Sequence, residues 1–373
     1  MSHTQKLYLA ATGMLSPLGS STEMTAASLR AGISAYRVSD YENLQDGFIT
    51  MTGIPEEIFT GFELEIDQGS ECCERYDRII KMAILAASQV FQRHPVSEPV
   101  PLVLSFAESL PHTPNISPEV MLDNLINQAK LPIDRRQVRT VHTGRAAVLQ
   151  SLDLAQRFLY DLQQDYVLVG ASDSYWDYST LAYLDEAERA LAPGVQNGFA
   201  PGEGACFFLL TRHPEKAHVQ DGHIIALNPA GVAQEPGHLN SEHVYRGEGL
   251  HQAFLQALQA YEGGGIHSIY SSMNGEHYWA KEYGVAMTRN ESCFCQGVQH
   301  HHPADSYGDL GAATGAALIA LAAEDLGKIK GPAAHLVYAS SDNAWRAALL
   351  LEKIPQHPTV NPKASPAREA KIP

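Results

Sequence analysis

Residues 143–155 read TGRAAVLQSLDLA, and the chain continues as QRFLYDLQQDYVLVGASDS to residue 174. Apolar side chains recur here at the three- and four-residue spacing of a helix with a broad buried face. They are Ala147, Leu149, Leu152, Leu154, Ala155, Phe158 and Leu159. A short apolar run, 167–170, follows and leads into the small polar residues 171–174. The stretch therefore predicts a helix buried in the core, followed by a central strand.

The composition is that of a large globular chain. The 373 residues are 45% hydrophobic, enough for one large domain or two ordinary ones. Forty-two acidic against 26 basic residues give a formal charge of −16. Because this balance disfavours non-specific binding of polyanions, we expect neither nucleic acid nor an anionic membrane as a partner.

The chain also lacks the sequence patterns of export and membrane insertion. The N-terminus, MSHTQKLYLAATGM, has no charged segment followed by a long apolar run, and no window approaches about 18 uninterrupted apolar residues. We therefore expect no signal peptide and no membrane span. The cysteines are odd in number and have no framework spacing, which fits a reducing, cytoplasmic location. They are Cys72, Cys73, Cys206, Cys293 and Cys295.

Strands and helices alternate along the chain. The expected strands are 7–12, 100–106, 167–170, 206–210, 224–227, 266–271, 335–340 and 344–351. The expected helices begin at Ser21 or Thr22, at Arg75, near Pro118, in the 143–155 stretch, near His251, within 272–287 and after Leu310. Residues 36–70 have no period and are expected to form surface loops. We divide the chain into an N-terminal half (1–215), a C-terminal half (216–353) and a disordered, proline-rich tail (354–373).

Two further motifs are specific. TGMLSPLG (12–19) precedes a helix that ends in LRAG (29–32), and GFAPGEGACFFLL spans 198–210. A phosphate-binding loop is a poor interpretation of the second motif, because Gly-Lys-Ser/Thr is missing and a strand follows where a helix is needed. Together with the 143–155 stretch, these motifs resemble the β-ketoacyl synthases of the thiolase-like superfamily over about residues 7–352. The resemblance implies an α/β fold of two similar halves, layered α-β-α-β-α.

The resemblance also implies where the reaction residues would stand. Those enzymes use a cysteine at the start of the central helix and two histidines, or a histidine and an asparagine. With the 143–155 stretch, Met-Asn-Gly (273–275) and Gly-Asp-Leu-Gly (308–311) as anchors of the alignment, the corresponding positions here hold Arg145, Asn274 and Asp309. An alignment slip of two or three residues would bring Thr143 or His142 to the cysteine position, and neither is a cysteine.

Two supporting positions of the family are altered as well. The lysine upstream of the second histidine maps to about Ala304, and the glycine-rich gate is replaced by SSDNA at 340–344. The scaffold motifs are therefore kept while the reaction motifs are lost. Loss of a catalytic nucleophile commonly lowers the rate about a million-fold, so we expect no Cys-His-His condensation.

The altered positions predict a polar pocket. Its candidate residues are His142, Thr143, Arg145, Asn274, Glu276, His277 and Asp309. A guanidinium is always charged, and at a helix N-terminus it opposes the macrodipole by up to roughly 1 kcal/mol. We expect Asp309, Glu276 or Asp173 to compensate it. Either the charges form a salt-bridged plug in the vacated site, or Arg145 binds the carboxylate or phosphate of another ligand.

Two functions follow from the resemblance. The first is a catalytically degenerate synthase homologue, a pseudoenzyme that acts by binding, like a chain length factor or a secretion-associated accessory protein. The alternative is a cysteine-independent acyltransferase, of 3-oxoacyl-synthase type, that acts on acyl thioesters in fatty acid or polyketide biosynthesis. Expected partners are a second copy in a homodimer or a synthase-like protein in a heterodimer, and an acyl-carrier protein. No cofactor is expected.

The remaining clusters predict less. His300, His301 and His302 invite a metal interpretation, together with His277, Cys293 and Cys295, but consecutive histidines point in different directions and Cys-x-Cys is the wrong spacing for a zinc knuckle. We therefore expect a solvated loop and no metal. The aromatic group Tyr175, Trp176 and Tyr178 is expected to pack in the core or a dimer interface, or to line a channel.

Overall fold

The computed structural model describes residues 5–67, 74–109, 116–259, 261 and 263–356. In the first half, the elements are β1 (Leu7–Leu15), α1 (Thr22–Arg30), β2 (Arg37–Glu42), β3 (Phe48–Met51), η1 (Glu56–Phe59), α2 (Glu74–Arg93), β4 (Val100–Ser105), α3 (Pro118–Asp123), η2 (Asn124–Gln128), β5 (Ile133–Val141), η3 (Gly144–Ala146), α4 (Ala147–Gln156), η4 (Arg157–Asp161), β6 (Tyr166–Ser174), α5 (Tyr178–Glu186) and β7 (Glu203–Thr211).

The second half continues with a matching series. Its elements are η5 (Pro214–Lys216), β8 (His223–Leu227), β9 (Gly231–Gln234), α6 (Glu248–Leu258), β10 (Ile266–Ser271), α7 (His277–Arg289), η6 (Glu291–Cys293), β11 (Phe294–His301), α8 (Ala304–Tyr307), η7 (Gly311–Ala313), α9 (Thr314–Lys328), β12 (Ala333–Ser340) and β13 (Trp345–Pro355).

The strands repeat one topology twice. Five of them follow the order β5-β4-β6-β7-β1, and five more follow the order β11-β10-β12-β13-β8. In each set the first two pairings are parallel and the last two are antiparallel. The sets meet where Leu7 and Tyr8 of β1 pair with Leu227 and Ala226 of β8. The chain is thus built from two similar halves, as the family resemblance implies.

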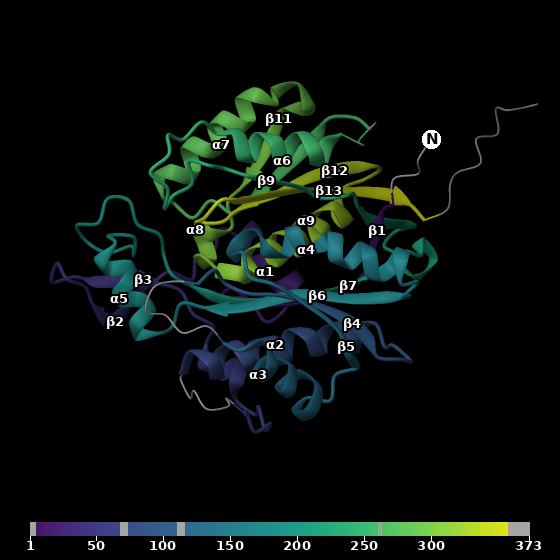
Figure 1. The fold of residues 1–373 in the computed structure, drawn as a ribbon, viewed down its shortest axis with the longest axis horizontal. Coiled ribbons are helices and arrows are strands. Elements are labelled where there is room, and N and C mark those ends of the chain that lie inside the picture. The colour runs from purple at the N-terminus through teal and green to yellow at the C-terminus, as the bar shows by residue number, and fades with distance from the viewer. Residues whose placement is uncertain (1–4, 68–73, 110–115, 260, 262, 357–373) are drawn as a thin grey trace, which may run out of the picture.

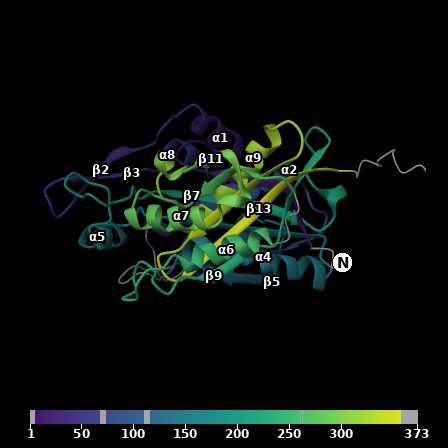
Figure 2. The same ribbon diagram turned by 90° about the horizontal axis from the view of Figure 1, so that it is seen from above.

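Helices and sheets form five layers. Helix α2 packs on β1, β6 and β7 from outside, and α6 packs on β9 and β13 from the opposite outer side. Helices α4 and α9 contact each other between the two sets of strands, as Figure 1 shows from the side. Figure 2 looks from above onto the outer layer, in which α6 and α7 lie in front of β13. The predicted α-β-α-β-α fold is confirmed.

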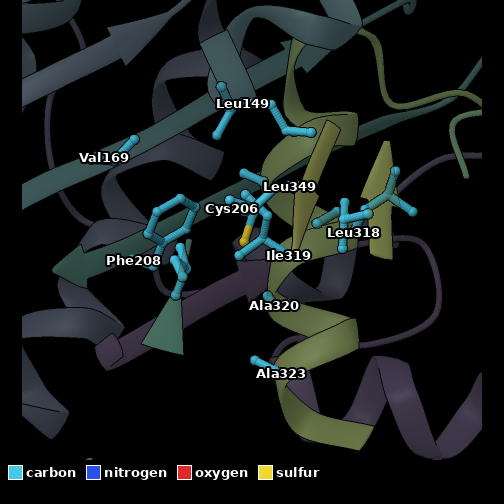
Figure 3. Close-up of a cluster of buried hydrophobic side chains, with 14 of the residues drawn as sticks. Leu149, Val169, Cys206, Phe208, Leu318, Ile319, Ala320, Ala323 and Leu349 are labelled. Carbon is cyan, nitrogen blue, oxygen red and sulfur yellow. The ribbon is translucent and has the colours of Figure 1, made fainter. Parts of the chain in front are cut away.

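The central layer is tightly packed because small residues line α9. A Cβ built on Gly315 would lie 2.7 Å from Leu149 Cδ1 and 2.9 Å from the backbone oxygen of Arg145. Around this contact, Cys206 of β7 lies fully buried among leucine, valine and phenylalanine side chains (Figure 3). Burial raises the pKa of the Cys206 thiol well above its usual range. This cysteine is a core residue and no nucleophile.

Some local predictions were wrong. Residues 36–70 are not all loop, because 37–42 and 48–51 form the antiparallel hairpin β2–β3. The sequence did not predict the polar strands β5 and β11. They form because they pair in parallel with β4 and β10. The α-helix of the central stretch begins only at Ala147, after the single turn η3. Cys72, Cys73 and the tail beyond residue 356 lie outside the described residues.

Candidate functional site

Four loops meet at the N-termini of the two central helices. They are η3 before α4, the turn after β10 (272–276), the segment before η7 (308–310) and the turn between β12 and β13 (341–344). Parallel strands β10 and β12 lie side by side, and their carboxyl ends therefore deliver the second and fourth loops to the same place. Arg145, Asn274 and Asp309, far apart in the sequence, come together there.

Arg145 is the centre of this cluster. Only 4% of the residue is exposed. Its Nη1 donates to Asp309 Oδ2 at 2.6 Å, its Nη2 donates to Asp342 Oδ1, and its Nε donates to the backbone oxygen of Ser340 at 2.9 Å. The guanidinium carbon also lies 4.5 Å from the centre of the Trp279 ring, in cation–π contact. All three nitrogens of the guanidinium are therefore engaged by the protein itself.

The 198–210 motif holds Asp309 in place. The backbone nitrogen of Asp309 donates to the oxygen of Ala200 at 2.9 Å. A Cβ on Gly202 would lie 2.9 Å from the backbone oxygen of Asp309, so this close approach requires glycine. The other carboxylate oxygen of Asp309, Oδ1, accepts from the nitrogen of Gly311 at 2.8 Å. A scaffold motif of the sequence thus positions the partner of Arg145.

Asn274 and Glu276 extend the cluster from the turn after β10. Asn274 Nδ2 donates to Asp309 Oδ2 at 2.9 Å and to Glu276 Oε2 at 3.1 Å. Glu276 also accepts from Trp279 Nε1 at 2.9 Å. Its main ionic partner is a second arginine, Arg189, which donates to Glu276 at 2.7 and 2.9 Å.

Sequence reasoning missed Arg189 and Asp342, which complete the network. Arg189 lies just after α5, and its Nη1 donates to Asp342 Oδ2 at 2.7 Å, so that Asp342 bridges the two arginines. Burial alone would raise the pKa of Asp342, but Arg145 and Arg189 outweigh burial and lower that pKa to about 2. Asp342 belongs to the SSDNA segment, where an acidic residue in place of the glycine-rich gate was the available signal.

The network leaves little free space. Two guanidiniums face the carboxylates of Asp309, Asp342 and Glu276, giving a formal charge of −1. Beside them is a cavity of only about 40 Å³, room for about one water molecule. Glu108 lines it, and burial together with Asp342 raises the pKa of this carboxyl. The site is filled by its own charges.

The other predicted pocket residues lie outside the network. The ring of His142 stacks on Phe106 at 4.8 Å and the residue is exposed, because the chain turns before it reaches η3. His277, a predicted pocket residue and the first residue of α7, is also exposed. Thr143 donates its hydroxyl to Gln150 Oε1 at 2.7 Å. Of the three acids expected to compensate Arg145, only Asp309 pairs with it directly, since Glu276 pairs with Arg189 and Asp173 with Arg75.

The histidine run is not a loop. His300 and His301 belong to β11; His300 Nδ1 contacts the hydroxyl of Tyr283, and His301 stacks on Tyr270 at 4.3 Å. His302 Nδ1 lies 2.5 Å from the hydroxyl of Ser271. Over the part of the chain that the structure describes, no group of three or more His, Cys, Asp or Glu residues could hold a metal ion.

The aromatic group after β6 divides between core and surface. The indole N–H of Trp176 donates to the backbone oxygen of Thr52 at 2.8 Å, and Tyr175 packs edge-on against Phe199. Tyr178 is 77% exposed. Among the helices that the structure describes, none has the length and apolar character needed to span a membrane.

The fold is the thiolase-like fold of solved ketosynthases and chain length factors. The ishigamide ketosynthase/chain length factor is similar over 94% of this chain and 99% of its own, with a TM-score of 0.72 and 16% identity. The ketosynthase from module 6 of the bacillaene synthase of Bacillus subtilis 168 is similar over 94% of this chain and 72% of its own, with a TM-score of 0.73 and 14% identity.

A third similar structure contains a carrier protein. It is a type II polyketide synthase acyl-carrier protein in complex with its ketosynthase. The similarity covers 94% of this chain and 100% of the matched chain, with a TM-score of 0.67 and 13% identity. No protein-family model matches the sequence, and no curated protein matches it. At these identities the likeness concerns the fold.

Proposed function

We propose that the protein is a catalytically degenerate β-ketoacyl-synthase homologue that acts by binding, as an accessory partner of an active synthase. The observation that carries the proposal is the fully engaged Arg145 at the start of the central helices. A guanidinium cannot attack a thioester, and this one is held by two carboxylates and a carbonyl. The plug interpretation of the sequence is therefore the one we adopt.

The geometry disfavours acyl transfer by another route. A substrate thioester would need to enter beside Arg145, where the cavity holds about 40 Å³, against several hundred Å³ in ordinary small-molecule sites. Ser341, the nearest hydroxyl on the turn, is already committed, since it donates to the oxygen of Thr143 and accepts from the nitrogen of Ala146 at 3.0 Å. The cysteine-independent acyltransferase remains the alternative that the experiment below separates.

The edge strand β5 is where we place the partner. Among the described residues β5 pairs only with β4, so its other edge is free for strand addition. Arg135, Arg136 and Arg139 are exposed on it, in a chain of net charge −16. A second copy of the chain on this edge would bring Arg136 and Arg139 of both strands close together, and like charges on facing strands are destabilising. We therefore infer a heterodimer in preference to a homodimer.

The named complexes support the same class of partner. The ishigamide protein is a ketosynthase/chain length factor, and a second similar structure is a ketosynthase bound to its acyl-carrier protein. We propose a synthase-like subunit as the first partner, an acyl-carrier protein as the second, and the cytoplasm as the location.

Co-purification tests the proposal. Tagged full-length protein is recovered from its native host, and the bound proteins are identified and quantified by mass spectrometry. We expect a synthase with an intact nucleophile in near-equal amount, reduced recovery with Arg136→Glu, and unchanged recovery with the exposed control Lys330→Glu. Recovery of the protein alone, together with acyl transfer by the isolated chain, would replace the proposal with the acyltransferase.

A further inference from the structure

A second and larger cavity lies beside the C-terminal part of α9. Its volume is about 350 Å³, within the range of small-molecule sites. It opens because β1 and β8 pair only at Leu7 and Tyr8 and then diverge, with a bulge in β1 between Leu9 and Ala11. Small residues of α9, Ala320, Ala323 and Gly327, face the opening and leave it unfilled.

One wall of this cavity is apolar. Leu9, Ala10 and Ala11 of β1, Ile225 of β8, and the two alanines of α9 line it. At the mouth, Glu23 and Arg93 form a two-bond ion pair with distances of 2.6 and 2.8 Å. Glu324, which also lines the cavity, pairs with Lys328 at 2.7 Å. The charges of Glu23, Arg93 and Glu324 are therefore each balanced by an ion-pair partner.

Lys353 of β13 is the exception. It lines the cavity, yet only 4% of the residue is exposed. Its ammonium donates to the backbone oxygens of Gly327 at 2.9 Å and Ile329 at 2.7 Å, at the C-terminal end of α9. An ammonium has three hydrogens, and within the described residues no carboxylate lies within ion-pair distance of this one. The cavity therefore holds a buried positive charge with carbonyl dipoles but no counter-ion.

We propose that this cavity binds a small carboxylate with an unbranched apolar tail of medium length. The carboxylate would complete the third hydrogen bond of Lys353, because a buried cation is stabilised most by an opposite charge. The tail would lie on the Leu9, Ile225, Ala320 and Ala323 wall, where burial of its apolar surface would favour binding. The site is separate from the Arg145 network and does not depend on the proposed accessory role.

Titration calorimetry of the full-length protein with octanoate tests this assignment. We expect saturable one-site binding, at least tenfold weaker binding of 1-octanol, which has the tail without the charge, and no measurable binding of acetate, which has the charge without the tail. Lys353→Met should weaken octanoate binding at least tenfold, whereas the exposed control Lys330→Met should leave it unchanged. Ala323→Phe, which fills the cavity and keeps Lys353, should abolish it.

Each contrary result is informative. Equal binding of octanol and octanoate, or full binding by Lys353→Met, would overturn the role of the ammonium. Unchanged octanoate binding by a folded Ala323→Phe variant would place the ligand elsewhere, and no saturable binding by the parent protein would overturn the site. If Lys353→Met does not fold, the octanol comparison and Ala323→Phe decide.

Discussion

Replacing Arg145 with methionine probes the ionic network most sharply. The substitution keeps an unbranched apolar side chain but removes the guanidinium, leaving Asp309 with Asn274 and backbone donors, and Asp342 with Arg189 alone. Removing one partner of a buried ion pair commonly costs about 3–5 kcal/mol, because the other charge stays buried without compensation. We expect a loss of that order in the free energy of unfolding, measured by urea denaturation at pH 7.

The same variant should change the acid response. In the parent protein the folded-state pKa of Asp342 is about 2, below its usual 3.8. A depressed carboxyl pKa stabilises the fold above pH 3.8 by about 2 kcal/mol, and this contribution is lost as the pH falls from 3.8 towards 2. With Arg145→Met the pKa of Asp342 should rise and this contribution should shrink. As a control, Arg157→Met removes the exposed pair with Asp153 and should cost under about 0.5 kcal/mol. Equal losses in the free energy of unfolding for Arg145→Met and Arg157→Met would refute the reasoning.

Three further changes test the packing and the buried titratable groups. Gly315→Ala should cost about 1–3 kcal/mol by overpacking against α4, whereas Gly284→Ala, with open space around it, should be neutral or stabilising; denaturant melts that rank the two in reverse would contradict this. Burial lowers the pKa of His335 from 6.5 to about 4, so about 3 kcal/mol of stability should be lost as the pH falls from 6.5 to 4. The urea midpoint of His335→Leu should not fall with pH in this range. A midpoint that falls as steeply as in the parent protein would contradict the role of His335. Iodoacetamide should label Cys206 only after unfolding, as peptide mass mapping reports, whereas labelling of Cys206 in the native protein would show that this thiol is accessible.

Much of the fold was predictable because its helices and strands are strongly periodic. The apolar stripe of the central stretch marks α4, and the small-residue run after Leu310 marks α9. The polar edge strand β5, IDRRQVRTV, and β11, FCQGVQHH, carry no such pattern. They are strands because a parallel neighbour is available, which is a tertiary effect that a local window cannot detect.

The site was predictable only where motifs anchored the alignment. Gly-Asp-Leu-Gly placed Asp309, and Met-Asn-Gly placed Asn274, so their meeting with Arg145 could be foreseen. Arg189 stands in a segment without a recognised motif, and Asp342 stands where the family's glycine-rich gate is replaced. Their pairing depends on how two distant turns close over the helix start. The solvent-facing positions of His142 and His277 depend on the same closure.

An assay for covalent acylation of this chain tests the account most directly. Purified full-length protein is incubated with acyl-loaded carrier protein and malonyl thioester, its intact mass is followed, and the products are separated, with an active ketosynthase run in parallel. We predict an unchanged mass and no 3-oxoacyl product under conditions in which the ketosynthase is acylated. A stoichiometric acyl adduct on this chain, or turnover to a 3-oxoacyl thioester, would contradict a site closed by Arg145.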